Sequence, residues 1–215
     1  MKKDLTELVF ILDKSGSMSG LEDDTIGGFN SMIEKQKAEP GQALVSTVLF
    51  NNESNVVHDR QDILDIAPMT RKDYFVSGTT ALLDAVGGAI HHIGNVHRYI
   101  RKEDVPEHTL FIITTDGMEN ASHKYTKEKV RQMIERQKSK YGWEFIFLGA
   151  NIDAVSAAGD IGIEEKFAVS YKSDPRGTKL NYEVLGEAVS NVRSNAPISD
   201  SWADRIKDDV KKRGR

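Results

Sequence analysis

The sequence predicts an α/β protein of the doubly wound, Rossmann-like class, with a mostly parallel central sheet and helices on both faces. Short apolar runs alternate with amphipathic helical patterns along most of the chain, which is typical of parallel strands linked by helices. The apolar runs are continuous, as expected for strands that are covered on both faces. A turn signal at Asn51-Asn52 precedes a further short run, which predicts one antiparallel strand at the edge of the sheet.

The first half of the chain predicts three strands and two helices. The expected elements are a strand at 8–12, a helix at about 21–37, strands at 43–50 and 55–58, a short helical turn at 62–66, and a helix with the apolar stripe Leu82, Leu83, Val86, Ile90 and Ile93. Gly27 and Gly28 lie inside the first helix and each cost about 1 kcal/mol relative to alanine. We therefore expect a packing reason for them.

The second half continues the alternation. The expected elements are a strand at 109–114, a helix at 126–140, a strand at 143–148, a short helix at 153–158, a strand at 167–169, a helix at 182–192, and a final stretch with Trp202, Ile206 and Val210 at four-residue spacing. We expect one domain over residues 1–195. Residues 196–215 are expected to form an amphipathic, basic C-terminal extension.

Composition excludes several functional classes. The length of 215 residues suits one domain with a sizeable core. The absence of cysteine excludes a disulfide framework, a thiolate metal site and a cysteine nucleophile. The formal charge is −4, which argues against general nucleic-acid binding. No apolar run approaches the ~20 residues of a membrane span, so we expect a cytoplasmic protein that does not bind membranes.

Oxygen-bearing side chains gather in three loops. The strand at 8–12 runs into Asp13-Lys14-Ser15-Gly16-Ser17, the strand at 109–114 runs into Thr115-Asp116-Gly117, and Ser77-Gly78-Thr79-Thr80 precedes the helix that begins near residue 82. Open α/β sheets bind ligands beyond the carboxyl ends of their strands, above all where the strand order reverses. We therefore expect these three loops to meet at one edge of the sheet.

Each loop by itself also has a simpler explanation. Ser15, Ser17 or Thr80 would serve as the N-cap of the helix that follows it. Asp116-Gly117 is a common turn dipeptide. The order of the three loops, and their places at the ends of the expected elements, favour a shared site over three separate local roles.

Together the three loops resemble the metal-ion-dependent adhesion site of the von Willebrand factor A family. The matching segments are Asp13-x-Ser15-x-Ser17, the Gly-Thr-Thr-Ala-Leu segment with Asp84-Ala85 behind it, and Thr115-Asp116-Gly117-x-x-Asn120. The resemblance covers residues 5–161. It implies a sheet in which the first and fourth strands are neighbours, and it is closest in kind to stand-alone, cytoplasmic bacterial members of the family.

Carried over position by position, the resemblance implies the metal ligands Asp13, Ser15, Ser17, Thr80 and Asp116. Thr80 keeps the family's spacing to Asp84-Ala85, and Thr79 remains the alternative. The expected rim of the site is formed by Lys14, Thr79, Glu119 and Asn120. We expect Asn120 to hold its loop by side-chain-to-backbone hydrogen bonds, and the Lys14 side chain to point into solvent.

The implied ligands are two carboxylates and three hydroxyls. Such hard oxygen donors suit Mg²⁺, the first expectation, as well as Mn²⁺ or Ca²⁺, and they disfavour Zn²⁺ or Cu²⁺. The resemblance implies that the cation keeps a position free for an Asp or Glu of a protein partner. The expected function is therefore metal-dependent protein binding without catalysis.

A metal-assisted phosphohydrolase that uses Asp13 and Asp116 is the alternative function. Asp13 at the end of the first strand is similar to the nucleophile of haloacid-dehalogenase-like phosphatases. That family places a second acid two residues further on as general acid and base. Ser15 stands at that place here, and a hydroxyl cannot do this work at neutral pH.

Three histidines lie on or near one helix but do not suggest a metal site. His91, His92 and His97 do not have the H-E-x-x-H spacing of a zinc-binding helix. We expect all three at the protein surface.

Overall fold

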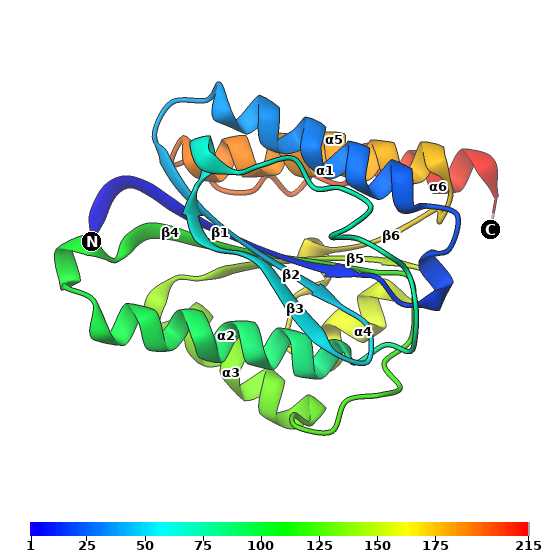
Figure 1. Ribbon diagram of the computed structural model, residues 1–215, viewed down its shortest axis with the longest axis horizontal. Helices are drawn as coiled ribbons and strands as arrows, with labels where there is room; N and C mark the ends of the chain where they lie inside the picture. Colours follow the sequence, from blue (N-terminus) through cyan, green and yellow to red (C-terminus); the bar gives the residue numbers. More distant parts are fainter. Residues whose placement is uncertain (215) are drawn as a thin grey trace.

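The computed structural model describes residues 1–214, which form one six-stranded sheet covered by helices. The strands are β1 (Lys2–Asp13), β2 (Gln42–Phe50), β3 (Ser54–Asp62), β4 (Pro106–Thr115), β5 (Glu144–Ala150) and β6 (Ala168–Tyr171). Their spatial order is β3-β2-β1-β4-β5-β6, and all neighbours pair in parallel except β2 and β3. The predicted fold class, with one antiparallel edge strand, is confirmed (Figure 1).

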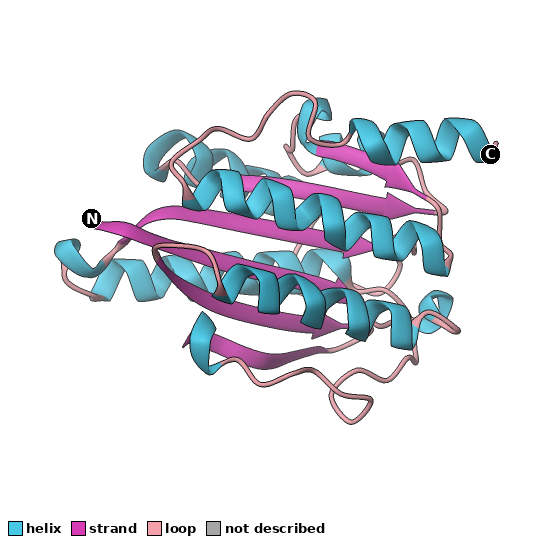
Figure 2. Cartoon of the chain, turned by 90° about the horizontal axis from the view of Figure 1, so that it is seen from above, coloured by secondary structure: helices cyan, strands magenta, loops and turns pink. Residues whose placement is uncertain are grey.

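Each face of the sheet carries its own layer of helices and its own apolar core. One layer contains α1 (Glu22–Lys37), α5 (Pro175–Arg193) and α6 (Asp204–Arg213), and the other contains α2 (Leu82–Tyr99), α3 (Lys127–Tyr141) and α4 (Ala154–Asp160) (Figures 1 and 2). Phe10 and Leu12 of β1 join the first core, whereas Val9 and Ile11 join the second. Because successive residues of a strand point to opposite faces, a strand between two helical layers has a nearly continuous apolar run, as Leu8 to Leu12 of β1 show.

The packing of α1 against α5 explains one of the two glycines inside α1. A Cβ atom added at Gly28 would lie 2.2 Å from Cδ2 of the Tyr182 ring, so only glycine allows this close approach. A Cβ at Gly27 would lie in open space, and no such reason applies there.

Several elements are longer than the apolar pattern predicts, among them β3, which was expected at 55–58 and spans Ser54–Asp62. β1 begins at Lys2, so its first half includes polar residues. α5 begins at Pro175 rather than near residue 182, because the Asp174 carboxylate caps the helix by accepting a bond from the Gly177 amide at 2.8 Å. Proline in the first helical position is favourable, so the Asp-Pro pair was a start signal that periodicity alone did not reveal.

The C-terminal segment packs into the first core. Trp202 and Ile206 are buried there, and the Trp202 indole Nε1 donates to the Lys166 carbonyl at 2.7 Å. The expected apolar stripe of this segment is therefore directed inward, although the boundary after residue 195 stays a prediction. Arg215, at the end of the basic run, lies outside the described residues. Within residues 1–214 no helix is both long and apolar enough to cross a membrane.

Candidate metal centre

The carboxyl ends of β1 and β4 lie side by side at the point where the strand order reverses. Leu12 of β1 is in register with Thr114 of β4, and the chain leaves these strands toward opposite sides of the sheet. The loop after β1 also meets the segment before α2, because the Gly16 amide donates to the Gly78 carbonyl at 3.0 Å. The three loops singled out in the sequence therefore meet at a switch point, where such sheets bind ligands.

Three hydroxyls and one carboxylate converge beside Gly117. The Ser17 hydroxyl donates to Asp116 Oδ1 at 2.5 Å, and the Oγ atoms of Ser15 and Ser17 lie 3.1 Å apart. A Cβ atom added at Gly117 would lie 2.7 Å from Thr80 Oγ1, 3.3 Å from Ser17 Oγ and 3.6 Å from Ser15 Oγ. The glycine thus leaves open a small space that oxygen atoms surround.

The simpler explanations of these hydroxyls are wrong. Ser15 precedes a short 3-10 helix at Gly16–Met18, but its side chain makes no capping hydrogen bond. The N-cap residue of α2 is Ala81 and not Thr80, and no side chain makes a capping hydrogen bond at this helix end. The hydroxyl groups are therefore directed toward the shared site and do not serve the helix ends.

Asp13 lies behind the hydroxyls and is held firmly. Its Oδ1 accepts from the Ser15 amide at 2.7 Å and its Oδ2 from the Thr115 hydroxyl at 2.6 Å, while the Tyr74 hydroxyl donates to its backbone carbonyl at 2.6 Å. Burial raises the pKa of Asp13 above its ordinary value, although the bonds from Ser15 and Thr115 oppose the rise. The arrangement fixes the position of the carboxylate without fully offsetting its charge.

Asp116 is the second buried acid. Burial raises its pKa, the nearby Asp13 charge raises it further, and the bonds from Ser17 and Ser173 lower it. The described part of the chain has no cluster of three or more His, Asp or Glu placed to hold a metal. A cation at this site would therefore depend on the hydroxyls as well as the acids. This all-oxygen donor set with incompletely offset negative charge fits Mg²⁺, Mn²⁺ or Ca²⁺.

The two candidate threonines differ clearly in position. Thr80 is buried and its hydroxyl faces the space beside Gly117, whereas Thr79 is exposed. The geometry therefore favours Thr80 as the ligand.

Asn120 and Glu119 support the site from behind. Asn120 Oδ1 accepts a hydrogen bond from the Thr80 backbone amide at 3.0 Å, and the Asn120 backbone amide donates to the Thr80 carbonyl at 3.0 Å. The side-chain-to-backbone bond predicted for Asn120 is therefore present. It fixes the segment at Thr80 and not the loop of Asn120 itself. The Glu119 carboxylate accepts from the Leu83 amide at 2.9 Å and the Ser122 amide at 2.8 Å. Glu119 thus ties the loop after β4 to the first turn of α2.

Lys14 does not point into solvent, and that expectation was wrong. Its side chain is buried, and Nζ lies 4.4 Å from the centre of the Phe75 ring, in the position of a cation–π contact. Burial lowers the pKa of Lys14, while the charge of Glu53 raises it.

No family model and no curated protein matches the sequence, whereas many solved structures match the fold. The von Willebrand factor type A structure from Catenulispora acidiphila aligns with a TM-score of 0.56 and 14% identity, over 86% of this chain and 42% of that chain. The chain has a von Willebrand factor A fold. Manganese-loaded TRAP protein from Plasmodium vivax aligns with a TM-score of 0.56 and 17% identity, over 84% and 73% of the two chains.

A third neighbour carries a named metal motif. Proximal thread matrix protein 1 of the mussel byssus, with a zinc-occupied MIDAS motif, aligns with a TM-score of 0.55 and 13% identity, over 86% of this chain and 46% of that one. The chain matches less than half the length of the Catenulispora and mussel chains. At such identities the likeness concerns the fold.

Two supporting residues of this von Willebrand factor A fold were missed in the sequence, and a third had no role assigned to it. Tyr74, which was missed, and Thr115, which belongs to the matching segment, hold Asp13. The Ser173 hydroxyl, also missed, donates to Asp116 Oδ2 at 3.3 Å from the loop between β6 and α5. Ser173 follows the carboxyl end of β6, so applying the strand-end rule to the last strand would have found it. Tyr74 carries no comparable local signal.

Replacing Gly117 by alanine is expected to abolish cation binding while leaving the protein folded. The new methyl would overlap with Thr80 Oγ1 and fill the space that the hydroxyls surround. Isothermal titration calorimetry with Mn²⁺ measures the loss. Gly88→Ala is the matched control, because a Cβ there meets nothing within 4 Å and should leave binding intact. Wild-type affinity in Gly117→Ala would show that the cation binds elsewhere.

Asp13→Asn is expected to stabilise the metal-free protein at neutral pH. Burial raises the pKa of Asp13 in the folded state above its value in the unfolded state. Ionisation of Asp13 therefore lowers the free energy of unfolding as the pH rises from the unfolded-state pKa to the folded-state pKa. Above both pKa values this loss of stability is complete. Below both values wild type and variant should differ little. The side-chain oxygen of asparagine can still accept the hydrogen bond from the Ser15 amide. The Thr115 hydroxyl can donate to the Gly117 carbonyl, 3.2 Å away, if its bond to residue 13 is lost.

Urea unfolding in chelator at several pH values tests this expectation. A variant that is less stable than wild type at pH 7 would show that the hydrogen bonds to the carboxylate outweigh its burial.

Proposed function

We propose that this chain is a divalent-metal-dependent protein-binding domain, which captures an Asp or Glu side chain of a partner through a cation held at Asp13, Ser15, Ser17, Thr80 and Asp116. The observation that supports this most strongly is the space beside Gly117, which three hydroxyls surround and beside which the Asp116 carboxylate bonds to Ser17. Zinc and manganese in two structural neighbours support the choice of a divalent cation. Mg²⁺ is the ion we expect in the cell, and a cytoplasmic location stays a prediction.

The charge balance of the site favours an acidic partner. The hydroxyls of Ser15, Ser17 and Thr80 are neutral, so only Asp13 and Asp116 offset the charge of the ion. When bound, the cation supplies a local positive centre. The chain has a net charge of −4 and cannot attract an acidic partner over long distances, so the positive centre is needed at the site itself.

Apolar side chains beside the site predict what flanks the partner's acid. Met118 follows Gly117 directly and is 73% exposed, and Phe75, beneath Lys14, is 52% exposed. Exposed large apolar residues beside a polar site are typical of protein-binding surfaces. We therefore propose that the partner presents its Asp or Glu next to an apolar residue.

Binding accounts for the residues around Asp13 better than phosphate hydrolysis does. Ser15, whose amide donates to Asp13 Oδ1, stands two residues after Asp13, where a phosphohydrolase of that kind needs a second acid, and a hydroxyl cannot act as general acid or base at neutral pH. We propose that this chain has no phosphatase activity, and turnover of p-nitrophenyl phosphate with Mg²⁺ or Mn²⁺ would contradict that statement.

Selection from a random peptide display library tests the proposed function. Panning on the immobilised protein in Mn²⁺, with elution by chelator, is expected to enrich peptides that contain an Asp or Glu beside an apolar residue. Changing that acid to its amide should abolish binding, and Met118→Ser should weaken binding while leaving Mn²⁺ affinity unchanged. Asp116→Ala protein is the control surface. Peptides that bind it equally well, or that bind equally in chelator, would contradict a metal-bridged contact.

A further inference from the structure

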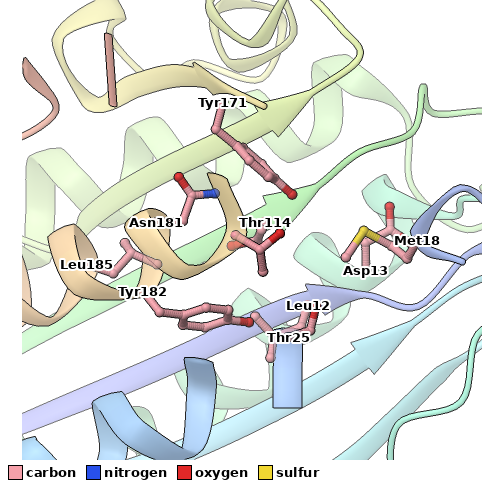
Figure 3. Close-up of a pocket in the computed structure, with 10 residues that line it drawn as sticks. Leu12, Asp13, Met18, Thr25, Thr114, Tyr171, Asn181, Tyr182 and Leu185 are labelled. Atoms are coloured by element: carbon pink, nitrogen blue, oxygen red, sulfur yellow. The ribbon is translucent and has the colours of Figure 1, made fainter. Parts of the chain in front are cut away.

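The residues of the candidate metal centre are held in place by two different means. Asp13 lies at the end of a strand and against the core, and Figure 3 shows it with Thr114 of β4 and Tyr182 of α5, which line the same small pocket beneath the site. Thr80 and Gly117 lie outside strands and helices, in the segment before α2 and in the loop after β4. Their positions therefore depend on the contacts that these two segments make.

The first turn of α2 takes its capping groups from the loop after β4. The N-cap residue of α2 makes no side-chain capping bond, so the first amides of the helix need acceptors from elsewhere. The Leu83 amide donates to the Glu119 carboxylate at 2.9 Å, and the Asp84 amide donates to the Ser122 hydroxyl at 3.0 Å. The loop thus caps a helix to which it is not joined in sequence.

The Asp84 carboxylate makes the bonds in the opposite direction, from the helix to the loop. Its Oδ2 accepts from the His123 amide at 3.0 Å, and its Oδ1 accepts from the amides of Lys124 at 2.8 Å and Tyr125 at 2.9 Å. Burial raises the pKa of Asp84, but the bonds from these amides and the charge of Lys124 outweigh it, so the pKa lies below its ordinary value. Three consecutive amides on one carboxylate fix the path of this part of the loop.

A glycine of α2 contacts the same part of the loop. A Cβ atom added at Gly87 would lie 2.5 Å from atoms of the Tyr125 ring, so the ring lies directly on the helix backbone. A Cβ added at the next residue, Gly88, would meet nothing within 4 Å. Asp84 and Gly87 are three residues apart and therefore lie on one face of the helix. Together they hold residues 123–125 against α2.

We propose that Asp84 is a positioning residue for the cation site, which holds the loop after β4 against α2 so that Gly117 and Thr80 face one another. The loop carries Gly117 near its beginning and the segment 123–125 near its end, and Thr80 precedes Asp84 by four residues. Asp84 therefore acts on both sides of the site through the backbone. This inference rests on the proposed function, because it concerns the affinity for the cation that the function requires.

Calorimetric titration of Mn²⁺ into four variants tests the proposal. Asp84→Ala should weaken Mn²⁺ binding by about 10–100-fold, as is typical when an outer-shell partner of a metal site is lost. Asp84→Asn should lose less, because one oxygen can still accept from Lys124 and Tyr125. Gly87→Ala should also weaken binding, because the methyl group displaces the Tyr125 ring without changing any charge. Gly88→Ala is the matched control and should bind like wild type.

The two kinds of variant separate positioning from charge. If Asp84→Ala weakens binding and Gly87→Ala does not, the carboxylate acts through its charge alone and the proposal is overturned. Wild-type affinity in Asp84→Ala also overturns it, while the proposed function stands. A wild-type protein that binds no Mn²⁺ contradicts the proposed function itself, and with it any effect of Asp84 on a cation.

Amide hydrogen exchange in the protein without metal is the second measurement. In Asp84→Ala, residues 117–125 should exchange faster than in wild type. Asp153→Ala loses a carboxylate that accepts from the Ser156 amide on α4 and should leave the exchange of residues 117–125 unchanged. Unchanged exchange there in Asp84→Ala would overturn the proposal, whether or not the protein binds Mn²⁺. If Asp84→Ala does not fold, Asp84→Asn serves for the same comparisons.

Discussion

Mn²⁺ or Mg²⁺ at about 100 times its dissociation constant is expected to stabilise the protein by about 2.7 kcal/mol. For a chain of this length that corresponds to a rise in melting temperature of roughly 5–10 °C. Asp116→Ala should abolish the rise, because it removes the carboxylate that faces the hydroxyls of Ser17 and Ser173. The metal-free variant should still fold, since the change also removes one of two neighbouring buried acids. Differential scanning fluorimetry with and without chelator measures both effects.

Asp153→Asn is the matched control for this experiment. Asp153 also follows the carboxyl end of a strand, β5, but it caps α4 by accepting from the Ser156 amide and takes no part in the site. Asparagine is an equally good N-cap, so this variant should retain the full metal-induced rise. A normal rise in Asp116→Ala would contradict the assigned site. Unfolding of Asp116→Ala without metal would show that Asp116 has a structural role.

Glu7→Ala is expected to destabilise the protein by about 3–5 kcal/mol, because it removes the buried carboxylate that Arg60 and His97 both contact. The Glu7 side chain is fully buried in β1. Its Oε1 accepts from Arg60 Nε at 2.6 Å, and its Oε2 lies 2.6 Å from His97 Nε2. The side chains of Arg60 and His97 are only 18% and 10% exposed, so water replaces the lost carboxylate poorly.

Urea unfolding of Glu7→Ala beside Glu103→Ala measures this cost. Glu103 is a surface acid, 70% exposed, whose loss should change the free energy of unfolding by less than about 0.5 kcal/mol. If Glu7→Ala also changes stability by less than about 1 kcal/mol, water must reach Arg60 and His97 after the change. The loss should leave metal binding intact in the folded protein, because Glu7 lies six residues before Asp13 along β1.

The Glu7 cluster shows where prediction from the sequence failed. We expected His97 at the surface with His91 and His92, and only the latter two are exposed. His97 contacts Glu7 and packs edge-on against the Trp143 ring, 5.4 Å between ring centres. Glu7 lies within a buried strand because Arg60 arrives from β3 and His97 from α2. Local apolar patterning contains no information about partners that lie 53 and 90 residues away.

The candidate site was largely predictable because its side chains stand directly after strands or before a helix. The end of a strand is a local feature of the sequence, and the parallel topology then brings several strand ends to one edge of the sheet. The positions of Asp13, Ser15, Ser17, Thr80 and Asp116 follow from this rule together with the family resemblance. The sequence could not show which of them other side chains hold in place.

The sequence by itself determined the order of strands and helices, the class of the fold and the loops that form the candidate site, because apolar periodicity and strand-end residues are local properties. The tertiary structure alone decided that Tyr74 holds the backbone of Asp13, that Ser173 reaches Asp116, and that Lys14 is buried against Phe75. These contacts join residues far apart in the chain, and their energies depend on burial and distance, which exist only once the helices have packed on the sheet.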